Sequence, residues 1–365
     1  MNRSEAAVQW AADRQHLESL GVTMPGVNSY LPDEYVRDYR LAMDAQPALS
    51  STDPNSAIPT IFTTMVDPKV FEGLFAPNKA ATIMGEERRG TWVDDTILFP
   101  IVEATGEVSS YDDDSEAGVA GANANWPARQ NYRLQINKRY GDLELDRAGA
   151  ARINWIAQLD KSCALMINKF MNLDYFYGIK NLQNYGLFND PNLNASLTPA
   201  TKAWGGTGWY NASSQIAATA NEIFADIQNL FTQLAATQTA GLINAESKMV
   251  LAMSPLSKAA LNTTNSFNVN VYKLIKDNYP NLDIVDAVQY AALSTSNPQG
   301  NPAGNFMQMI AKDVEGQDTG FCAYAERFKA HRIEVKTSSV RQKISAAIWG
   351  TVLRMTSTVA SMVGI

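Results

Sequence analysis

An unbroken apolar stripe runs through one stretch of the sequence, with its members three or four residues apart: Ile156, Leu159, Cys163, Met166, Phe170, Leu173 and Tyr177. This spacing places every member on one face of an α-helix, which turns once in about 3.6 residues. We expect one helix from about Asp146 to Tyr177, with Gly178 as its stop. At a rise of about 1.5 Å per residue, the helix would be on the order of 48 Å long. The fold must therefore hold a helix that acts as a strut across the molecule.

Strand-like patterns precede this helix. A short apolar run, "TILFPIV", begins at Thr96, and apolar and polar residues alternate in "YRLQINKRY" and again in "DLELD". The first two are separated by Ser109–Gln130, a long stretch of acidic, small and polar residues with nothing to bury. Loops of such length inside a compact domain are usually functional or mobile. We therefore expect a long β-hairpin at this place in the chain.

The second half of the sequence alternates helix and strand patterns. An amphipathic helix is expected from Ser213 or Ser214 to Gly241, followed by a buried strand in "KMVLAMSP" and short helices in 255–262 and "VNVYKLIKDNYP". Strand-like "LDIVDAVQY" and "FMQMIAKDV" flank the loop "STSNPQGNPAGN", and the chain from Phe328 onward again has the pattern of strands. The fold class is therefore α+β with one dominant helix.

Residues 1–60 have the composition of an arm. Prolines at positions 25, 32, 47, 54 and 59 exclude a continuous helix or a central strand there. A disordered leader is one interpretation, and an extended segment ordered against another chain is the other. Four aromatic side chains favour the second, since a solvated tail gains nothing from them: Trp10, Tyr30, Tyr35 and Tyr39.

Charge and cysteine usage restrict the function classes. The chain of 365 residues is 45% hydrophobic with a net charge of −7, which disfavours a free protein that coats nucleic acid through a basic face. Cys163 and Cys322 lie far apart, so we expect neither a disulfide framework nor a cysteine-rich zinc site, and a reducing compartment fits. The N-terminus lacks the apolar run of a signal peptide, and the C-terminal tail is too polar to span a membrane. We expect a soluble protein made inside a cell.

Residues suited to catalysis are few. The two histidines, His16 and His331, belong to no metal-binding motif, and the sequence holds no nucleophile elbow, phosphate loop or dinucleotide fingerprint. The glycine-rich "WGGTGWY" is expected to be a surface turn, and Cys163 a core residue of the long helix. We therefore expect no catalytic residue, no cofactor and no metal. A hydrolase that uses some set of carboxylates has no motif behind it.

The acidic run "DDDSE", Asp112–Glu116, is the best metal candidate. A calcium loop of the EF-hand type that began at Asp112 would need glycine at its sixth position and glutamate at its twelfth. The sequence has Ala117 and Asn123 at those positions, so the sharp turn and the bidentate ligand are both missing. An EF-hand is excluded.

Three stretches taken together resemble one family. They are "LFPIVEATGEVSSYDDDSE", "YGDLELDRAGAARINW" at the start of the long helix, and "FYGIKNLQNYGLFNDPNL" at its end, which is the most specific of the three. These resemble the major capsid proteins of tailed bacteriophages with the Hong Kong 97-like capsid fold. The resemblance covers about Ile58 to Leu193 well, and the order of the later elements fits it through the C-terminus.

The resemblance implies five parts along the chain, each defined by its residue range. They are an N-terminal arm at 1–60, the start of the peripheral domain with an extended β-hairpin loop (about 90–142) at 61–145, the spine helix and more of the peripheral domain at 146–249, the axial domain at 250–324, and C-terminal strands of the peripheral domain at 325–365.

The same resemblance implies a structural protein and not an enzyme. The subunit would self-assemble as hexamers and pentamers into the icosahedral head of a tailed bacteriophage, around double-stranded DNA that it contacts weakly and without sequence specificity. A separate scaffolding protein and a portal are the implied partners, decoration proteins stay open, and assembly would take place in the host bacterial cytoplasm without a membrane. A bacterial encapsulin-type nanocompartment shell is the alternative of the same fold, and a carboxylate-dependent hydrolase is the remote one.

In that setting the acidic run becomes a candidate contact between subunits. Three adjacent carboxylates repel one another by roughly 1 kcal/mol per close pair even in a high dielectric, so they favour cationic company. We expect them to meet Lys or Arg of a neighbouring subunit, and a solvated acidic turn is the alternative that stays open. The candidate contact residues are Asp112, Asp113, Asp114 and Glu116, with Arg129 on the return strand as a local cation.

Overall fold

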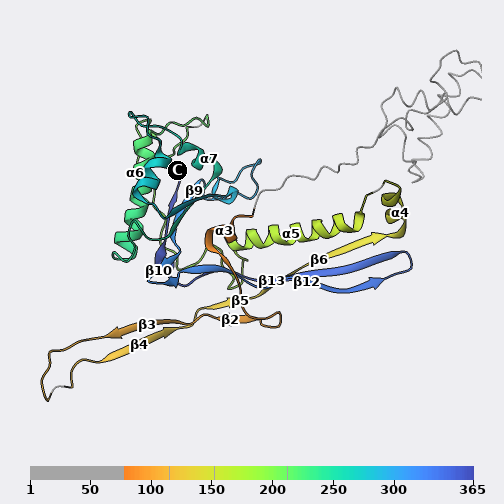
Figure 1. The fold of residues 1–365 in the computed structure, drawn as a ribbon, viewed down its shortest axis with the longest axis horizontal. Coiled ribbons are helices and arrows are strands. Elements are labelled where there is room, and N and C mark those ends of the chain that lie inside the picture. The colour runs from red at the N-terminus through yellow and green to blue at the C-terminus, as the bar shows by residue number, and fades with distance from the viewer. Residues whose placement is uncertain (1–77, 115, 152, 212) are drawn as a thin grey trace, which may run out of the picture. The chain divides into compact units, whose positions relative to one another are not determined.

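The computed structural model describes residues 78–365 except 115, 152 and 212 (Figure 1). The expected arm at 1–60 lies outside the described residues. Within them, helices accompany two four-stranded sheets and two short ribbons at the predicted hairpin, as the α+β class requires. Short elements complete the chain: α3 (Ala80–Met84), the pair β10 (Asp313–Val314) and β11 (Gln317–Asp318), and the 3-10 turns Val288–Tyr290 and Thr356–Thr358.

The first sheet contains the longest strands. Its order is β1 (Glu86–Arg88), β12 (Gly320–Val335), β13 (Ser339–Leu353) and β6 (Tyr132–Gly141), with β1 parallel to β12 and the other pairs antiparallel. The expectation that "YRLQINKRY" is a strand of the hairpin is wrong, because it forms β6 and pairs along its whole length with β13. Its alternating Leu134 and Ile136 pack against the core beneath α5, which the hairpin could not offer them.

The helix predicted for 146–177 is two helices, α4 (Asp142–Ala150) and α5 (Trp155–Tyr177). "DLELD", expected as a strand, forms the first turn of α4, where the carboxylate of Glu144 accepts a hydrogen bond from the backbone N–H of Gly141. A new N-cap then starts α5, since the side chain of Asn154 accepts from the N–H of Ala157 at 3.2 Å. With 23 residues, α5 is about 35 Å long.

The buried face of α5 is rotated from the predicted stripe. α5 packs on β6 and β13 through Cys163, Ile167 and Met171, which follow one another at intervals of four. Phe170, a member of the stripe, keeps 37% of its surface exposed while its ring stacks on Tyr132 at 5.8 Å. The spacing of apolar residues in the sequence identifies the helix, but the position of β6 and β13 determines which apolar side of α5 is buried.

The segment that follows α5 folds back on the end of the helix. Gly178 ends the helix with a positive φ of 63°, as predicted. Gly186 then lies so close to the backbone of Phe176 that a Cβ atom would stand 2.3 Å from its carbonyl. This approach lets the N–H groups of Leu187 and Phe188 donate to the last helical carbonyls, those of Tyr175 and Phe176, at 2.8 and 3.0 Å.

The second sheet has the order β14 (Val359–Val363), β9 (Phe306–Ala311), β7 (Met249–Met253) and β8 (Leu282–Asp286). The predicted buried strand and the two short helices are confirmed as β7, α7 (Pro255–Ala260) and α8 (Val271–Asn278). The predicted helix that ends at Gly241 is α6 (Ala220–Thr232), continued by a π-helical turn at Gln233–Gln238. It begins at Thr219 rather than at 213 or 214, because Thr219 and Glu222 form a reciprocal capping box.

Two hydrophobic cores meet at β7. Met249, Leu251 and Met253 point into one core, which also holds α6, α8 and alternate residues of β9. Val250 and Ala252 point to the other side, into the core under α5. Because α6 and β14 share the first of these cores, they group with 249–311 and not with α5.

The predicted hairpin is present and consists of two ribbons in line. β2 (Thr96–Leu98) pairs with β5 (Ala128–Gln130), and beyond Pro100 β3 (Ile101–Gly106) pairs with β4 (Ala120–Asn125). A third core fixes its base to the first sheet, with Phe99 against Phe321 and the ring of Trp349 nearby. The free end of the hairpin therefore begins where this core stops.

Candidate functional site

The acidic run lies at the end of the hairpin, between β3 and β4. Its four acids, called here the acidic tip, are all exposed: Asp112, Asp113, Asp114 and Glu116. The hydroxyl of Tyr111, itself 91% exposed, donates a hydrogen bond to Asp113. In the described part of the chain, no Lys or Arg pairs with these carboxylates, and no group of three acids, cysteines or histidines is arranged to hold a metal ion.

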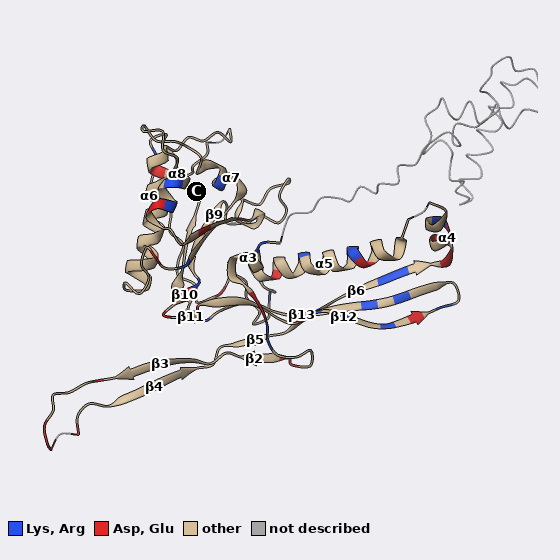
Figure 2. Cartoon of the chain, in the orientation of Figure 1, with Lys and Arg blue, Asp and Glu red and all other residues tan. Residues whose placement is uncertain are grey.

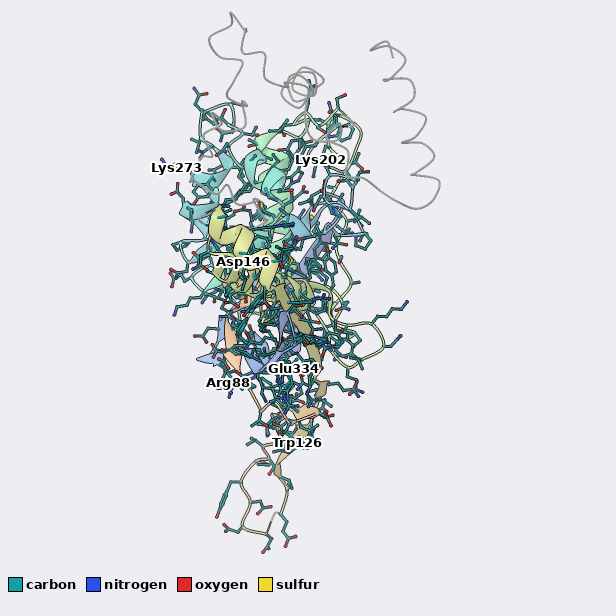
Figure 3. All side chains as sticks on the ribbon, turned by 90° about the vertical axis from the view of Figure 1, so that its right-hand side faces the viewer. Arg88, Trp126, Asp146, Lys202, Lys273 and Glu334 are labelled. Atoms are coloured by element: carbon teal, nitrogen blue, oxygen red, sulfur yellow. The ribbon has the colours of Figure 1, made fainter. Side chains whose placement is uncertain are left out.

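The hairpin exposes apolar side chains as well as acids. Every residue of β4 is exposed, and Val108 next to the acidic tip keeps 97% of its surface in solvent. Figure 3 labels Trp126 on this hairpin, where the indole is also exposed. An isolated two-stranded ribbon is marginally stable in water, so a partner surface is the natural source of its stability.

Arg129 is not brought to the acidic tip. It lies on β5, where its guanidinium is buried, binds the carboxylate of Asp190 at 2.7 Å and stacks over the ring of Tyr185 at 4.9 Å. Burial lowers the pKa of this guanidinium, and Asp190 partly offsets the effect. Arg129 therefore joins the base of the hairpin to the segment after α5, and no cation of the described residues pairs with the acidic tip.

The first sheet carries a group of cations on the side away from α5, toward its free end. Lys138 of β6 points to the helix and pairs with Asp160 there, so its neighbours Asn137 and Arg139 point to the opposite side. Figure 2 shows Lys and Arg gathered along β6, β13 and β12. The exposed cations of this region, called here the basic face, are Arg139, Arg332, Lys336, Arg341 and Lys343.

The sequence reasoning missed the basic face. The signal was present as adjacent cations in "NKRY", as cations at alternate positions in "VRQK" and as a cluster in "HRIEVK". The first stretch is about two hundred residues away from the other two in the chain, and only the pairing of β6 with β13 brings it to them. Glu334 is the acid among them and is labelled in Figure 3.

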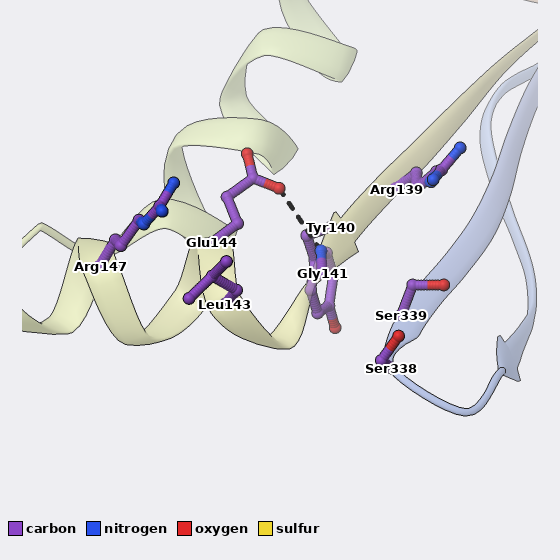
Figure 4. Close-up of a pocket in the computed structure, with 8 residues that line it drawn as sticks. All are labelled: Arg139, Tyr140, Gly141, Leu143, Glu144, Arg147, Ser338 and Ser339. Carbon is purple, nitrogen blue, oxygen red and sulfur yellow. Dashed lines mark hydrogen bonds between the residues drawn. The ribbon is translucent and has the colours of Figure 1, made fainter. Parts of the chain in front are cut away.

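A pocket at the same end of the sheet joins the basic face to α4 (Figure 4). Arg139 from β6, Arg147 from α4 and Ser339 from β13 contribute to its lining. Glu144 also lines it, but the carboxylate of Glu144 is engaged in the cap of α4. The pocket offers positive charge and hydroxyl groups, and it holds no pair of groups arranged as nucleophile and base.

The outer side of α5 is a further apolar surface. Ile156, Met166 and Phe170 belong to the predicted stripe, and each keeps more than a third of its surface exposed. Their row is parallel to the buried row on the same helix. A helix that is apolar on two sides is typical of one that is covered by more than its own chain.

The described residues offer no reactive centre. Both thiols are buried, and burial raises the pKa of Cys163 and of Cys322. Burial likewise raises the pKa of Asp174 to about 8, and neither of its carboxylate oxygens has a hydrogen-bond partner there. The glycine-rich stretch around Gly205 is the turn that was predicted, with Trp209 buried beneath it. No helix in this part of the chain is both long enough and apolar enough to cross a membrane.

The fold is similar to that of capsid proteins of known structure. The capsid protein of Myoviridae phage XM1 matches with a TM-score of 0.65 and 12% identity, over 84% of this chain and 99% of that chain. A chain from a structure of Gordonia phage Cozz matches with a TM-score of 0.55 and 9% identity, over 87% of this chain and 96% of that chain. The capsid of a native GTA particle matches with a TM-score of 0.54 and 10% identity, over 87% and 99%. At such identities the likeness concerns the fold alone.

A family model covers most of the chain. A search of curated proteins finds no match. The model described as Pa193 gp26 major capsid protein, in contrast, matches residues 49–364, a range that includes both sheets, α5 and the hairpin. The proteins of such a family are structural components of a virion and not enzymes, which agrees with surfaces built for contact. The chain therefore belongs to the Pa193 gp26 major capsid protein family, and it is a subunit of a bacteriophage capsid shell.

Proposed function

We propose that this subunit assembles as hexamers and pentamers into the icosahedral head of a tailed bacteriophage, which encloses double-stranded DNA. The observation that carries the proposal is the hairpin beyond Pro100, whose strands β3 and β4 are exposed almost throughout. Such a ribbon gains its stability from neighbouring subunits. Many copies that each add a modest contact then form a shell through avidity.

The parts of the Hong Kong 97-like fold are assigned to this chain as follows. The hairpin β2–β5 is the extended loop, α5 is the spine helix, and the first sheet belongs to the peripheral domain. The second sheet with α6 forms the axial domain, supported by their common core. Residues 1–60 are the N-terminal arm, for which the aromatic residues among its prolines support a role against another chain.

The partners follow from the same model of assembly. The net charge of −7 fits a container that touches packaged DNA weakly. Because one subunit that forms both hexamers and pentamers does not by itself define a shell size, a separate scaffolding protein and a portal complete the assembly. Assembly takes place in the host bacterial cytoplasm.

Electron microscopy tests the proposal directly. The protein is expressed alone and together with the products of neighbouring phage genes, and the particles are imaged by negative stain and assayed for protected DNA. Closed shells, tubes or capsomer rings are the expected result. A strictly monomeric protein at high concentration in every combination would contradict the proposal, and shells filled with an enzyme would favour a nanocompartment instead.

A further inference from the structure

Two surfaces of opposite charge form no ion pair with the rest of residues 78–365, the part that the structure describes. One is the acidic tip of the hairpin, and the other is the basic face of the first sheet. Among the described residues, no hydrogen bond or ion pair joins any side chain of either surface to a group of opposite charge. Each surface therefore has charge left to neutralise.

The strand register makes this imbalance costly on the basic face. Arg139 on β6 is the direct register partner of Arg341 on β13, and Lys343 follows two residues further along the same side. On its other flank Arg341 has Glu334 of β12 as its register partner, but no acid stands opposite Arg139, because β6 is the edge strand. Like charges placed directly opposite each other in an antiparallel pair are destabilising. The isolated subunit thus keeps a repulsion that a bound anionic group would remove.

The chain already uses this side of the sheet to bind its own hairpin. Near the hairpin base, Asp95 pairs with Arg133 of β6 at 2.6 Å, and the ammonium of Lys329 lies over the ring of Trp92 at 4.7 Å. The part of the sheet that bears Arg139 and Arg341 lies further along the same strands and is not covered in this way. This side of the sheet therefore already binds one acidic residue of a hairpin through a cation.

A second copy of the chain is the partner that satisfies both surfaces at once. A nucleic acid would neutralise the basic face but would leave the acidic tip unpaired. The acidic tip carries four carboxylates, and the basic face carries five cations with Glu334 among them, so the negative charge of one surface nearly equals the positive charge of the other. A shell supplies such copies at high effective concentration.

We infer that the acidic tip of one subunit docks on the basic face of a neighbouring subunit. This inference rests on the proposed assembly and names the two surfaces that meet in it. The contact is electrostatic and largely solvent-exposed, so it weakens as the salt concentration rises.

Reciprocal charge reversal tests the contact in the full-length chain. A tip variant carries Asp112→Lys, Asp113→Lys and Asp114→Lys, and a face variant carries Arg139→Glu, Arg341→Glu and Lys343→Glu. In the tip variant both surfaces are basic, and in the face variant both are acidic. Two copies of the same variant therefore repel each other at this contact, whereas a tip variant and a face variant attract each other. We expect each variant alone to lose shells on the order of tenfold or more, since like-charge juxtaposition strongly disfavours an interface. An equimolar mixture of the two should assemble again.

Controls separate this contact from folding and from general charge effects. Circular dichroism and thermal unfolding check that each variant folds like the wild type. Three exposed acids outside both surfaces, replaced as Asp277→Lys, Asp283→Lys and Asp318→Lys, give the same change in net charge as the tip variant and should leave the shell yield unchanged.

The outcomes distinguish the inference from the proposed function. Wild-type protein that forms no particles would contradict the proposed function itself. Wild-type shells together with normal shells from either reversal variant would overturn the docking alone. Shells of the face variant that form normally but lose their DNA would also overturn it and would assign the basic face to nucleic acid.

Discussion

Arg139 on β6 and Arg341 on β13 stand directly opposite each other, and both side chains are exposed. Arg341 also has Glu334 of β12 opposite it, whereas Arg139 lies on the edge strand and has only Arg341 as its register partner. In an isolated subunit the Arg139–Arg341 repulsion opposes folding, so we expect Arg139→Thr to raise the free energy of unfolding by about 0.2–1 kcal/mol. Urea titration of unassembled protein measures the change. A double-mutant cycle with Arg341→Thr isolates the repulsion, because Arg139→Thr should gain less when Arg341 is already replaced. Strict additivity would show that the two arginines do not interact.

Burial of Asp174 should make the free energy of unfolding depend on pH in an unusual direction. Its pKa is raised by burial from 3.8 to about 8 in the folded subunit, so the folded state holds a proton that the unfolded chain releases near pH 4. The cost of burying Asp174 is therefore absent below about pH 4 and grows as the pH rises toward 8, by about 1.4 kcal/mol per unit. We expect Asp174→Asn to flatten this slope and to stabilise the subunit at pH 7 by about 4 kcal/mol. Unfolding curves at a series of pH values check both effects, and parallel slopes would contradict them.

At Gly186 we expect that even one added methyl group is not tolerated. A Cβ there would stand 2.3 Å from the carbonyl of Phe176 and would push the chain away from the end of α5. We expect Gly186→Ala to cost about 3 kcal/mol or more. Gly149→Ala in α4 is the matched control, because nothing lies within 4 Å of its Cβ position, and it should be neutral or stabilising by up to about 1 kcal/mol. Equal unfolding midpoints for the two variants would argue against the close approach.

The buried pair of Arg129 and Asp190 should respond strongly to the loss of one partner. Arg129→Met leaves the carboxylate of Asp190 buried without a counter-charge, at an expected cost of about 3–5 kcal/mol. Adding Asp190→Asn removes that charge while keeping an acceptor for the N–H of Asn192, so much of the loss should be recovered. Arg88→Met at the exposed pair with Glu326 should cost at most about 1 kcal/mol. Chemical denaturation of the three variants and the wild type measures these costs, and a small effect of Arg129→Met would show that the pair is dispensable.

Local patterns in the sequence predicted the elements better than their limits and partners. The stripe that ends at Tyr177 predicted α5, and Gly178 predicted its end. The break before Trp155 was missed because apolar residues continue on both sides of it, and a single cap at Asn154 outweighs that continuity. Which side of α5 is buried depends on β13, and a periodic sequence contains no information about its partner.

The interaction surfaces show the same limit more clearly. The acidic tip was found because its residues are adjacent in the chain and lie in a stretch with nothing to bury. The basic face was missed because its members become neighbours only through the pairing of β6 with β13. Arg129 was expected near the tip, but a buried Asp190 sixty-one residues away in the chain holds it elsewhere. Long-range pairing, rather than composition, decides these arrangements.

The strand β7 contributes side chains to two hydrophobic cores, one on each face of its sheet. Its residues alternate between the core of the second sheet, through Leu251, and the core under α5, through Val250. Loss of β7 would remove packing from both cores at once. We therefore expect the two cores to unfold as one cooperative unit, while the exposed end of the hairpin becomes ordered only in the shell.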